Sequence, residues 1–244
     1  KSDRTSLILE LRKWFCISNL ADIPKLAFSG AFRIRQNNTV NIYVLFAWIR
    51  LCQIQASKFE LKETLNINLL KESLLEIKKI IFAAPEKIQE ELQKVFCKCG
   101  IVFNIIRNFK GAPVHGYIRK DSDGTLALSM TIRRAYADIF WFTLFHEIGH
   151  ILNGDIINDS FIDYSKCNNE AEHEADNFAK NILINPYDYE KFLSNNWNSK
   201  NAIQKFANSQ GVPEYIVIGR LQKDGYLKYN QFSNEKVRYF WADD

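Results

Sequence analysis

Two histidines four residues apart, with a glutamate directly after the first, stand in the apolar run FWFTLFHEIGHILNG of residues 140–154. In an α-helix, residues i and i+4 share one face, so His146 and His150 can offer two ring nitrogens to a single metal ion. Glu147 points about 100° away around the helix, which directs it to a metal-bound water and not to the metal. Zinc suits such a pair because it accepts nitrogen and carboxylate ligands and keeps a fourth position for water in catalytic sites. The spacing therefore predicts a Zn²⁺ site in which Glu147 is the general base.

A second helix supplies carboxylates for the third zinc ligand. Residues 169–184, NEAEHEADNFAKNILI, carry glutamates at 170, 172 and 174, beginning twenty residues after the second histidine. Of these, Glu172 has an aspartate one turn later, Asp176, which can accept the N–H of a zinc-bound histidine and fix its tautomer. We therefore assign Glu172 as the ligand and Asp176 as the residue that orients a histidine, with Glu170 and Glu174 as alternatives.

A simpler explanation of the same residues is a buried helix with two hydrogen-bonded histidines. Against it, three of the four histidines fall between residues 145 and 176, and a glutamate-rich helix follows at a distance typical of zinc peptidases. His173 lies beside the assigned ligand but faces away from it, so we expect it at the surface. Hydrolysis also needs a donor for the developing oxyanion, for which His115, Tyr136 and Arg133 are candidates, with a structural role as the alternative for each.

Helix-forming patterns dominate residues 1 to about 95, which we predict to be a helical N-terminal region. Apolar residues recur at helical spacing in LILELRKWF and TVNIYVLFAWIRLCQIQA. KESLLEIKKIIFAA has one apolar stripe, with Lys78 and Lys79 expected on a solvated face. Pro85 suits the first turn of the next helix and Gly100 suits its end.

The pattern changes to short β-branched or alternating runs after residue 100. GIVFNIIRN, APVHGYIRK and TLALSMTIR are separated by turn signals, so we predict three strands, the last two as a hairpin. The third strand is expected to form the sheet edge on which an extended peptide lies. The histidine-bearing helix follows, with Asp138 as its N-cap and Asn153-Gly154 as its stop.

Residues 187–244 are predicted to form a C-terminal helical segment packed on a zincin-like core of residues 96–186. NAIQKFANSQGVPEYIVIGRLQKDG has the spacing of a helix-turn-helix, with a small residue, a turn glycine and an apolar residue at 207, 211 and 217. Lys205, Arg220 and Lys223 offer few charges for phosphates, and Pro213 stands in the first turn of the second helix. A structural helical hairpin is therefore favoured over DNA binding. The expected fold class is α+β, with a small mixed sheet between helical regions.

Composition limits the class of protein. The 244 residues are 47% hydrophobic and 25% charged, a globular balance, and the apolar runs fall short of the roughly 20 residues that a bilayer span needs. Five scattered cysteines indicate reduced thiols in a cytoplasmic protein, and Cys97 and Cys99 lack a second pair at zinc-finger spacing. The net charge of +4 neither requires nor excludes nucleic acid. A start at Lys1 is typical of a fragment, and the first residues lack the apolar region of a signal peptide.

The two helical motifs together resemble the ImmA/IrrE metallo-endopeptidase family. D-x-F-W-F-T-L-F-H-E-I-G-H-I-L is followed by E-x-E-A-D-x-F-A at residues 172–179, and KGAPV at 110–114 and V-x-G-R-L-Q at 217–222 extend the likeness. Within the family, the chain is similar to the HigA-like antitoxin branch. The resemblance implies a gluzincin core with zinc bound by His146, His150 and Glu172, and Glu147 as the base.

The same resemblance implies a role in bacterial or phage regulation. Some members of the family cleave a helix-turn-helix repressor in stress or toxin-antitoxin control, so the expected partner is such a repressor or another regulator. Members of the branch usually carry a DNA-binding helix-turn-helix ahead of the metallopeptidase part, and none is evident ahead of the helical N-terminal region here, which argues against autonomous promoter binding. A rival hypothesis is a non-proteolytic antitoxin-type regulator or binding module, but such a scaffold has no need for Glu147 as a base.

Overall fold

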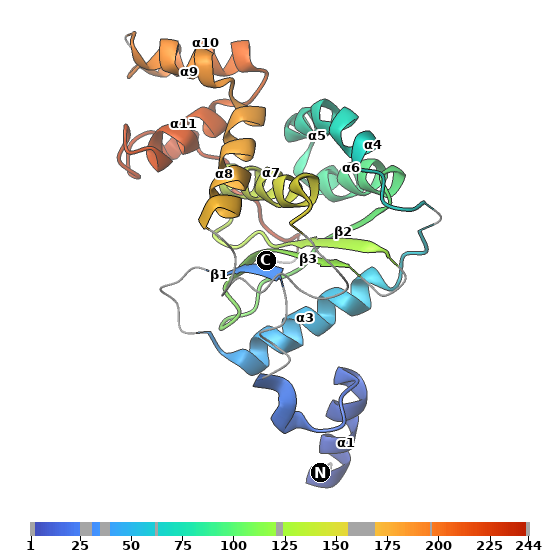
Figure 1. Ribbon diagram of the computed structural model, residues 1–244. Coiled ribbons are helices and arrows are strands. Elements are labelled where there is room, and N and C mark those ends of the chain that lie inside the picture. The colour runs from blue at the N-terminus through green and yellow to red at the C-terminus, as the bar shows by residue number, and fades with distance from the viewer. Residues whose placement is uncertain are drawn as a thin grey trace.

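A four-stranded sheet lies between two layers of helices in the computed structural model (Figure 1). The structure describes residues 3–24, 31–34, 40–61, 63–120, 124–155, 169–195 and 197–242. The strands are β1 (Ala31–Ile34), β2 (Ile101–Ile105), β3 (Val114–Lys120) and β4 (Leu126–Met130), in the order β1-β3-β4-β2. β2 runs parallel to β4, and the other pairs are antiparallel. The α+β class with a small mixed sheet is therefore confirmed.

Helices fill most of the remaining described chain. The longer ones are α1 (Arg4–Phe15), α3 (Ile42–Ala56), α4 (Ile67–Glu72), α5 (Leu74–Lys79), α6 (Pro85–Lys98), α7 (Ala137–Asn153), α8 (Asn169–Leu183), α9 (Pro186–Leu193), α10 (Lys200–Gln210) and α11 (Glu214–Lys223). Short 3₁₀ turns span Leu20–Asp22, Ile80–Phe82 and Ser233–Glu235. In the described part of the chain, no helix is both long and apolar enough to cross a membrane.

Each face of the sheet has its own hydrophobic core. On one face α3 packs Leu45 and Trp48 against Val114 and Tyr117 of β3. On the other face, α4 to α7 and the C-terminal helices enclose a larger core that includes Ile118 of β3 and much of β4. The sheet is therefore buried on both sides, and α7 is held between it and the outer helices (Figure 1).

The predicted hairpin of residues 112–133 is confirmed as β3 and β4, but the prediction that its second strand forms a sheet edge is wrong. β4 lies between β3 and β2, and every one of its residues is buried. A strand buried on both sides reads as a continuous apolar run, as LALSM does, apart from its serine. The non-local parallel pairing with β2 takes the side that the local hairpin leaves open.

The prediction that residues 1 to 95 are helical fails at β1. These four residues pair antiparallel with β3, which begins eighty positions after the end of β1. The alternation F-R-I-R, between Ser29-Gly30 and Asn37-Asn38, was the available strand signal. It was too short to outweigh the helical patterns on both sides.

Two local predictions around the helices need correction. The N-cap of α7 is Tyr136, since the left-handed residues Arg134 and Ala135 turn the chain two positions earlier than expected, and Asp138 is buried in the first turn. Lys78 is not on a solvated face, because its Nζ donates to the last carbonyls of α8, at 3.0 Å to Ile182 and 2.9 Å to Leu183. Such a bond satisfies carbonyls that a helix end leaves without intrahelical partners.

The predicted helix ends hold at three places. Pro85 occupies the first turn of α6, and Gly100 follows its C-cap with φ of 75°. Gly154 caps α7 in the left-handed conformation, with φ of 76°. Glycine adopts this conformation without the steric cost that a Cβ adds.

The C-terminal segment returns to the start of α7. Ala137 donates its N–H to the carbonyl of Val237 at 3.0 Å, and the indole of Trp141 donates to the hydroxyl of Tyr239 at 2.9 Å. Lys236 reaches the buried carboxylate of Asp138 at 2.7 Å. These contacts fix the N-terminal end of the helix that carries both motif histidines.

Candidate metal centre

Three donor groups converge between α7 and α8. One ligand atom from each of His146, His150 and Glu172 lies within 4.8 Å of the other two, and the described residues contain no other such group. The two Nε2 atoms are 3.0 Å apart. The Glu172 carboxylate lies 3.5 Å from Nε2 of His146 and 3.3 Å from Nε2 of His150. The structure thus brings together the three residues assigned from the sequence, whereas the alternatives Glu170 and Glu174 are exposed.

A glycine within the motif allows the two helices to approach. A Cβ on Gly149 would lie 3.1 Å from Cα of Ala175 and 3.2 Å from the ring of Phe178. Such a contact is tighter than ordinary van der Waals packing, so a side chain here would push α8 away from α7. The H-E-I-G-H sequence therefore supplies the close contact that carries Glu172 to the histidines as well as the histidines themselves.

An aspartate orients each histidine ring. Nδ1 of His146 lies 2.8 Å from Oδ1 of Asp176, and Nδ1 of His150 lies 2.8 Å from Oδ2 of Asp155. A carboxylate on Nδ1 holds the proton there and leaves Nε2 with its lone pair free for a metal. The arrangement gives both rings the tautomer that zinc requires.

Asp155 was not foreseen from the sequence. It follows Gly154, and its N–H bonds back to the carbonyl of His150 at 3.1 Å. This is the helix-ending arrangement in which a left-handed glycine folds the next residue onto the last turn. The signal was present in Asn-Gly-Asp, because a polar residue directly after a C-terminal glycine lies near the residue four or five positions before it.

Glu147 is buried beside the same site. Its side chain is 0% exposed and lies over Gly116 of β3, where a Cβ would come within 2.7 Å of its Cγ and Cδ. The glycine leaves the space that the carboxylate occupies. Glu147 is therefore enclosed by the sheet on one side and by its own helix on the other.

The structure places the three candidate oxyanion donors in different surroundings. His115 lies next to Gly116 in β3, and its Nε2 is 3.3 Å from Nη1 of Arg133. Tyr136 precedes α7 and is ten residues from the first metal-binding histidine, which is roughly 15 Å along a helix axis. Its ring packs beneath Lys236. Tyr136 therefore has a structural role, while His115 and Arg133 stay near the strand that lines the site.

The charges around the histidines shift two pKa values. Burial lowers the pKa of His150, but hydrogen bonds and negative charge from Glu172, Glu147 and Asp155 outweigh burial and raise it from 6.5 to about 9. Burial raises the pKa of Glu172, but hydrogen bonds from His146 and His150 and their positive charge move it well below its ordinary value. The site therefore favours a positive charge between carboxylates, as a metal cation would supply.

The donor set fits zinc. Two imidazole nitrogens and one carboxylate form a three-ligand arrangement of catalytic zinc sites, which leave a further position for water or substrate. Oxygen-preferring cations such as Mg²⁺ and Ca²⁺ are a poorer match for two imidazoles. His146, His150 and Glu172 are the residues that would hold the ion.

Other features singled out in the sequence lie outside this site. α10 and α11 form the expected helical hairpin, but Arg220 pairs with Asp224 and its guanidinium lies 4.7 Å from the ring centroid of Tyr189. His173 is exposed, as expected. Cys16, Cys52, Cys97 and Cys99 are free thiols, and Cys167 lies outside the described residues.

A family comparison agrees with this geometry. Residues 137–222 match the model of a peptidase family described as the IrrE N-terminal-like domain, and no curated protein matches the chain. The matched range runs from α7 to α11 and includes all three proposed ligands and Glu147. The match supports the ImmA/IrrE family and a metallopeptidase-like protein.

Proposed function

We propose that this protein is a zinc-dependent metallo-endopeptidase with a gluzincin core. The observation that carries the proposal is the convergence of His146, His150 and Glu172 beside a fully buried Glu147. A pair of oriented histidines alone would serve a structural metal. The buried carboxylate next to them supplies the base that hydrolysis needs.

Zinc, when bound, polarises a carbonyl and lowers the pKa of a coordinated water. Glu147 takes a proton from the attacking water and passes it to the amine nitrogen of the substrate. The water oxygen bonds to the carbonyl carbon, the C–N bond breaks, and the products are a carboxylate and an amine. Asp176 and Asp155 keep the histidine protons on Nδ1 throughout. His115 and Arg133, on or beside β3, are the candidate donors to the oxygen that gains negative charge.

The substrate that we propose is a regulatory protein, such as a helix-turn-helix repressor or a toxin-antitoxin partner. Support comes from the family match and from the motif resemblance within it. We place this activity in the cytoplasm, where the free thiols would stay reduced.

The first test is zinc content by elemental analysis of the native chain and of Glu172→Ala. We expect one zinc per chain in the native protein and little or none in the variant. Glu174→Ala, an exposed glutamate two residues further along α8, is the matched control and should keep its zinc. Absence of zinc from the native chain would refute the proposal.

The second test separates binding from catalysis. Glu147→Gln should retain zinc, because Glu147 is not a ligand, but should lose cleavage of a co-purified regulator or of unfolded casein. If Glu147→Gln cleaves as fast as the native chain, Glu147 is not the base. If the native chain binds zinc but cleaves neither the co-purified regulator nor casein, the zincin fold serves recognition and not hydrolysis.

A further inference from the structure

One outer edge of the sheet is closed by glutamine side chains. β2 has its free side toward α6, where Gln89 accepts the N–H of Ile105 at 3.2 Å and Gln93 donates to the carbonyl of Phe103 at 3.1 Å. These main-chain groups are therefore already bonded. A further polypeptide strand cannot pair with this edge without displacing both glutamines.

Toward the opposite edge of the sheet, β3 lies against the proposed catalytic base. Gly116 of β3 lies against the side chain of Glu147 and is paired with Met130 of β4. The carbonyl of Met130 accepts from Ile106, on the side away from β3. Along an antiparallel ladder, residue pairs that exchange hydrogen bonds alternate with pairs that do not. The Gly116–Met130 pair is one that does not, so the N–H and C=O of Gly116 point away from β4. They are directed to the side on which β1 lies.

β1 pairs with this side of β3, but the register of the pairing shifts beside Gly116. Ala31 is opposite Ile118 and Phe32 is opposite Tyr117, but the register shifts before Ile34, which is opposite Val114. Two residues of β3, at 115 and 116, therefore face one residue of β1. Such bulges interrupt the ladder locally and are over-represented next to active sites.

The position of a substrate follows from strand spacing. Neighbouring strands lie about 4.8 Å apart, so a chain added outside β1 would be roughly 10 Å from the β3 backbone. A scissile carbonyl must come within reach of the base directly or through one water. A chain in place of β1 meets this requirement, whereas a chain added outside β1 does not.

We propose that β1 holds the place of the substrate: an extended polypeptide pairs with the β3 edge beside Glu147, and β1 must leave before it binds. This inference rests on the proposed function, because it concerns the binding edge of the same site. Recognition through main-chain hydrogen bonds selects an extended, unfolded segment and places little demand on its sequence.

The test measures binding without turnover, in the Glu147→Gln background. The probe is fluorescently labelled, dephosphorylated casein, an unfolded protein, followed by anisotropy. Ala31 faces Ile118 with its peptide groups, so Ala31→Pro removes an N–H that pairing with β3 uses, while Ala31→Val retains it. We expect Ala31→Pro to bind casein at least tenfold more tightly than Ala31→Val. A synthetic peptide of residues 29–36 should displace the casein.

A second pair of variants and a second measurement guard against misfolding. Ile34→Pro and Ile34→Val repeat the comparison at the other end of β1, and circular dichroism shows which variants fold. In the chain with β1 intact, saturating casein should accelerate hydrogen exchange of the amides of residues 31–34. Unchanged exchange, or equal casein affinity of folded proline and valine variants, overturns the role of β1.

Failure of this inference is distinguishable from failure of the peptidase proposal. The role of β1 alone is refuted if the proline and valine variants bind casein equally well in the Glu147→Gln background, and the same variants with Glu147 restored cleave casein at the native rate. Tighter binding by the proline variants, with zinc bound but no cleavage, would keep β1 as the placeholder and refute the peptidase.

Discussion

α1 and α7 are both rich in apolar residues, and the fold uses them in opposite ways. Thirteen of the seventeen residues of α7 are buried, whereas none of the residues of α1 is buried by the part of the chain that the structure describes. α1 lies at the far end of the molecule from α7 and contacts α3 (Figure 1). Leu7, Ile8 and Leu9 are each about half exposed, at 49%, 47% and 56%.

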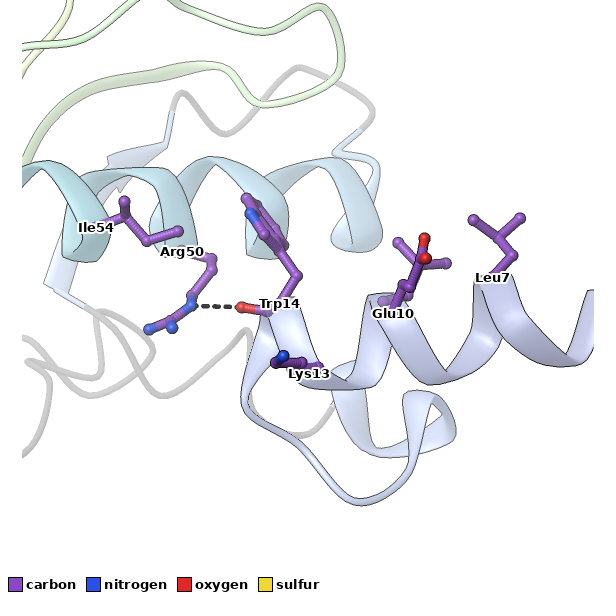
Figure 2. Close-up of a pocket in the computed structure, with 7 residues that line it drawn as sticks. Leu7, Glu10, Lys13, Trp14, Arg50 and Ile54 are labelled. Carbon is purple, nitrogen blue, oxygen red and sulfur yellow. Dashed lines mark hydrogen bonds between the residues drawn. The ribbon is translucent and has the colours of Figure 1, made fainter. Parts of the chain in front are cut away.

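The two helices differ in how the apolar residues are distributed and in how much of the described chain packs on them. In α7 they cover most of the helix circumference, which is the pattern of a helix enclosed on all sides. In α1, Leu7, Leu11 and Trp14 also recur at helical spacing, but they stay 49%, 36% and 40% exposed beside α3. Figure 2 shows α1 attached to α3 through the Trp14 carbonyl, which accepts from Nε of Arg50 at 2.7 Å.

Burial is greatest around the helix whose position the chemistry depends on. The two histidines of the proposed metal site stand on α7, which is held by the sheet, by α8 and by the C-terminal segment. A displacement of 1 Å would spoil a zinc site, and a helix buried along its whole length resists such a displacement. α1 has no comparable constraint.

The largest expected effect comes from removing a tryptophan from α7. Trp141 is 0% exposed and donates from its indole N–H to the hydroxyl of Tyr239 at 2.9 Å. Trp141→Ala leaves a cavity and removes one hydrogen bond of the Tyr239 hydroxyl, so we expect a loss of about 3–5 kcal/mol in the free energy of unfolding. Urea denaturation followed by circular dichroism measures it. A loss below about 1 kcal/mol would mean that α7 is less tightly held than its burial indicates.

The next effect concerns the aspartates that orient the histidines. Asp155→Ala and Asp176→Ala should each weaken zinc binding by about 10–100-fold, because the histidine loses the carboxylate that fixes its tautomer. Competition with a chromophoric chelator measures the affinity, and Glu174→Ala is the control on the exposed side of α8. If Asp155→Ala matches the control, the Asp155 contact has no part in zinc binding.

These two aspartates also mark the limit of inference from the sequence. Asp176 could be assigned because it shares a helix with Glu172 at fixed spacing, and helical geometry places both. Asp155 depends on how the chain leaves a helix, which is a local but less regular feature. The three proposed metal ligands were predictable for the same reason as Asp176, since each motif is a short helical pattern.

The sheet was less predictable because its order depends on pairing between distant segments. The β3–β4 hairpin follows from the turn signal Asp121-Ser-Asp-Gly124 in the sequence, and its two strands were identified. The parallel pairing of β2 with β4 and the addition of β1 to β3 join residues separated by other elements, and no local pattern specifies such neighbours. The edge strand was therefore assigned wrongly.

A comparable effect is expected from pH. The pKa of His150 in the metal-free protein is raised from 6.5 to about 9, so zinc must displace a proton below pH 9. Zinc affinity should fall by up to about tenfold for each pH unit below 9 and level off above it. Chelator competition between pH 7 and 9.5 tests this slope, and a flat profile would contradict it.

The same shift affects the metal-free protein with a defined sign. A histidine whose folded pKa is raised contributes stability fully below its unfolded value of 6.5, and the contribution is lost as pH rises through about 9. Metal-free chain should therefore become less stable to urea between pH 6.5 and 9. Zinc-loaded chain, in which the imidazole is already neutral, should not show this loss from His150.

The smallest effect is expected in α1, from the substitution that is largest in α7. Trp14 is 40% exposed, and it accepts the Arg50 hydrogen bond through its main-chain carbonyl, which Trp14→Ala retains. We expect a change within about 0.5 kcal/mol in the free energy of unfolding and no change in zinc affinity. The same urea denaturation and chelator competition measure both. A loss comparable to that of Trp141→Ala would show that α1 is held as firmly as α7, and the contrast between the two helices would then be wrong.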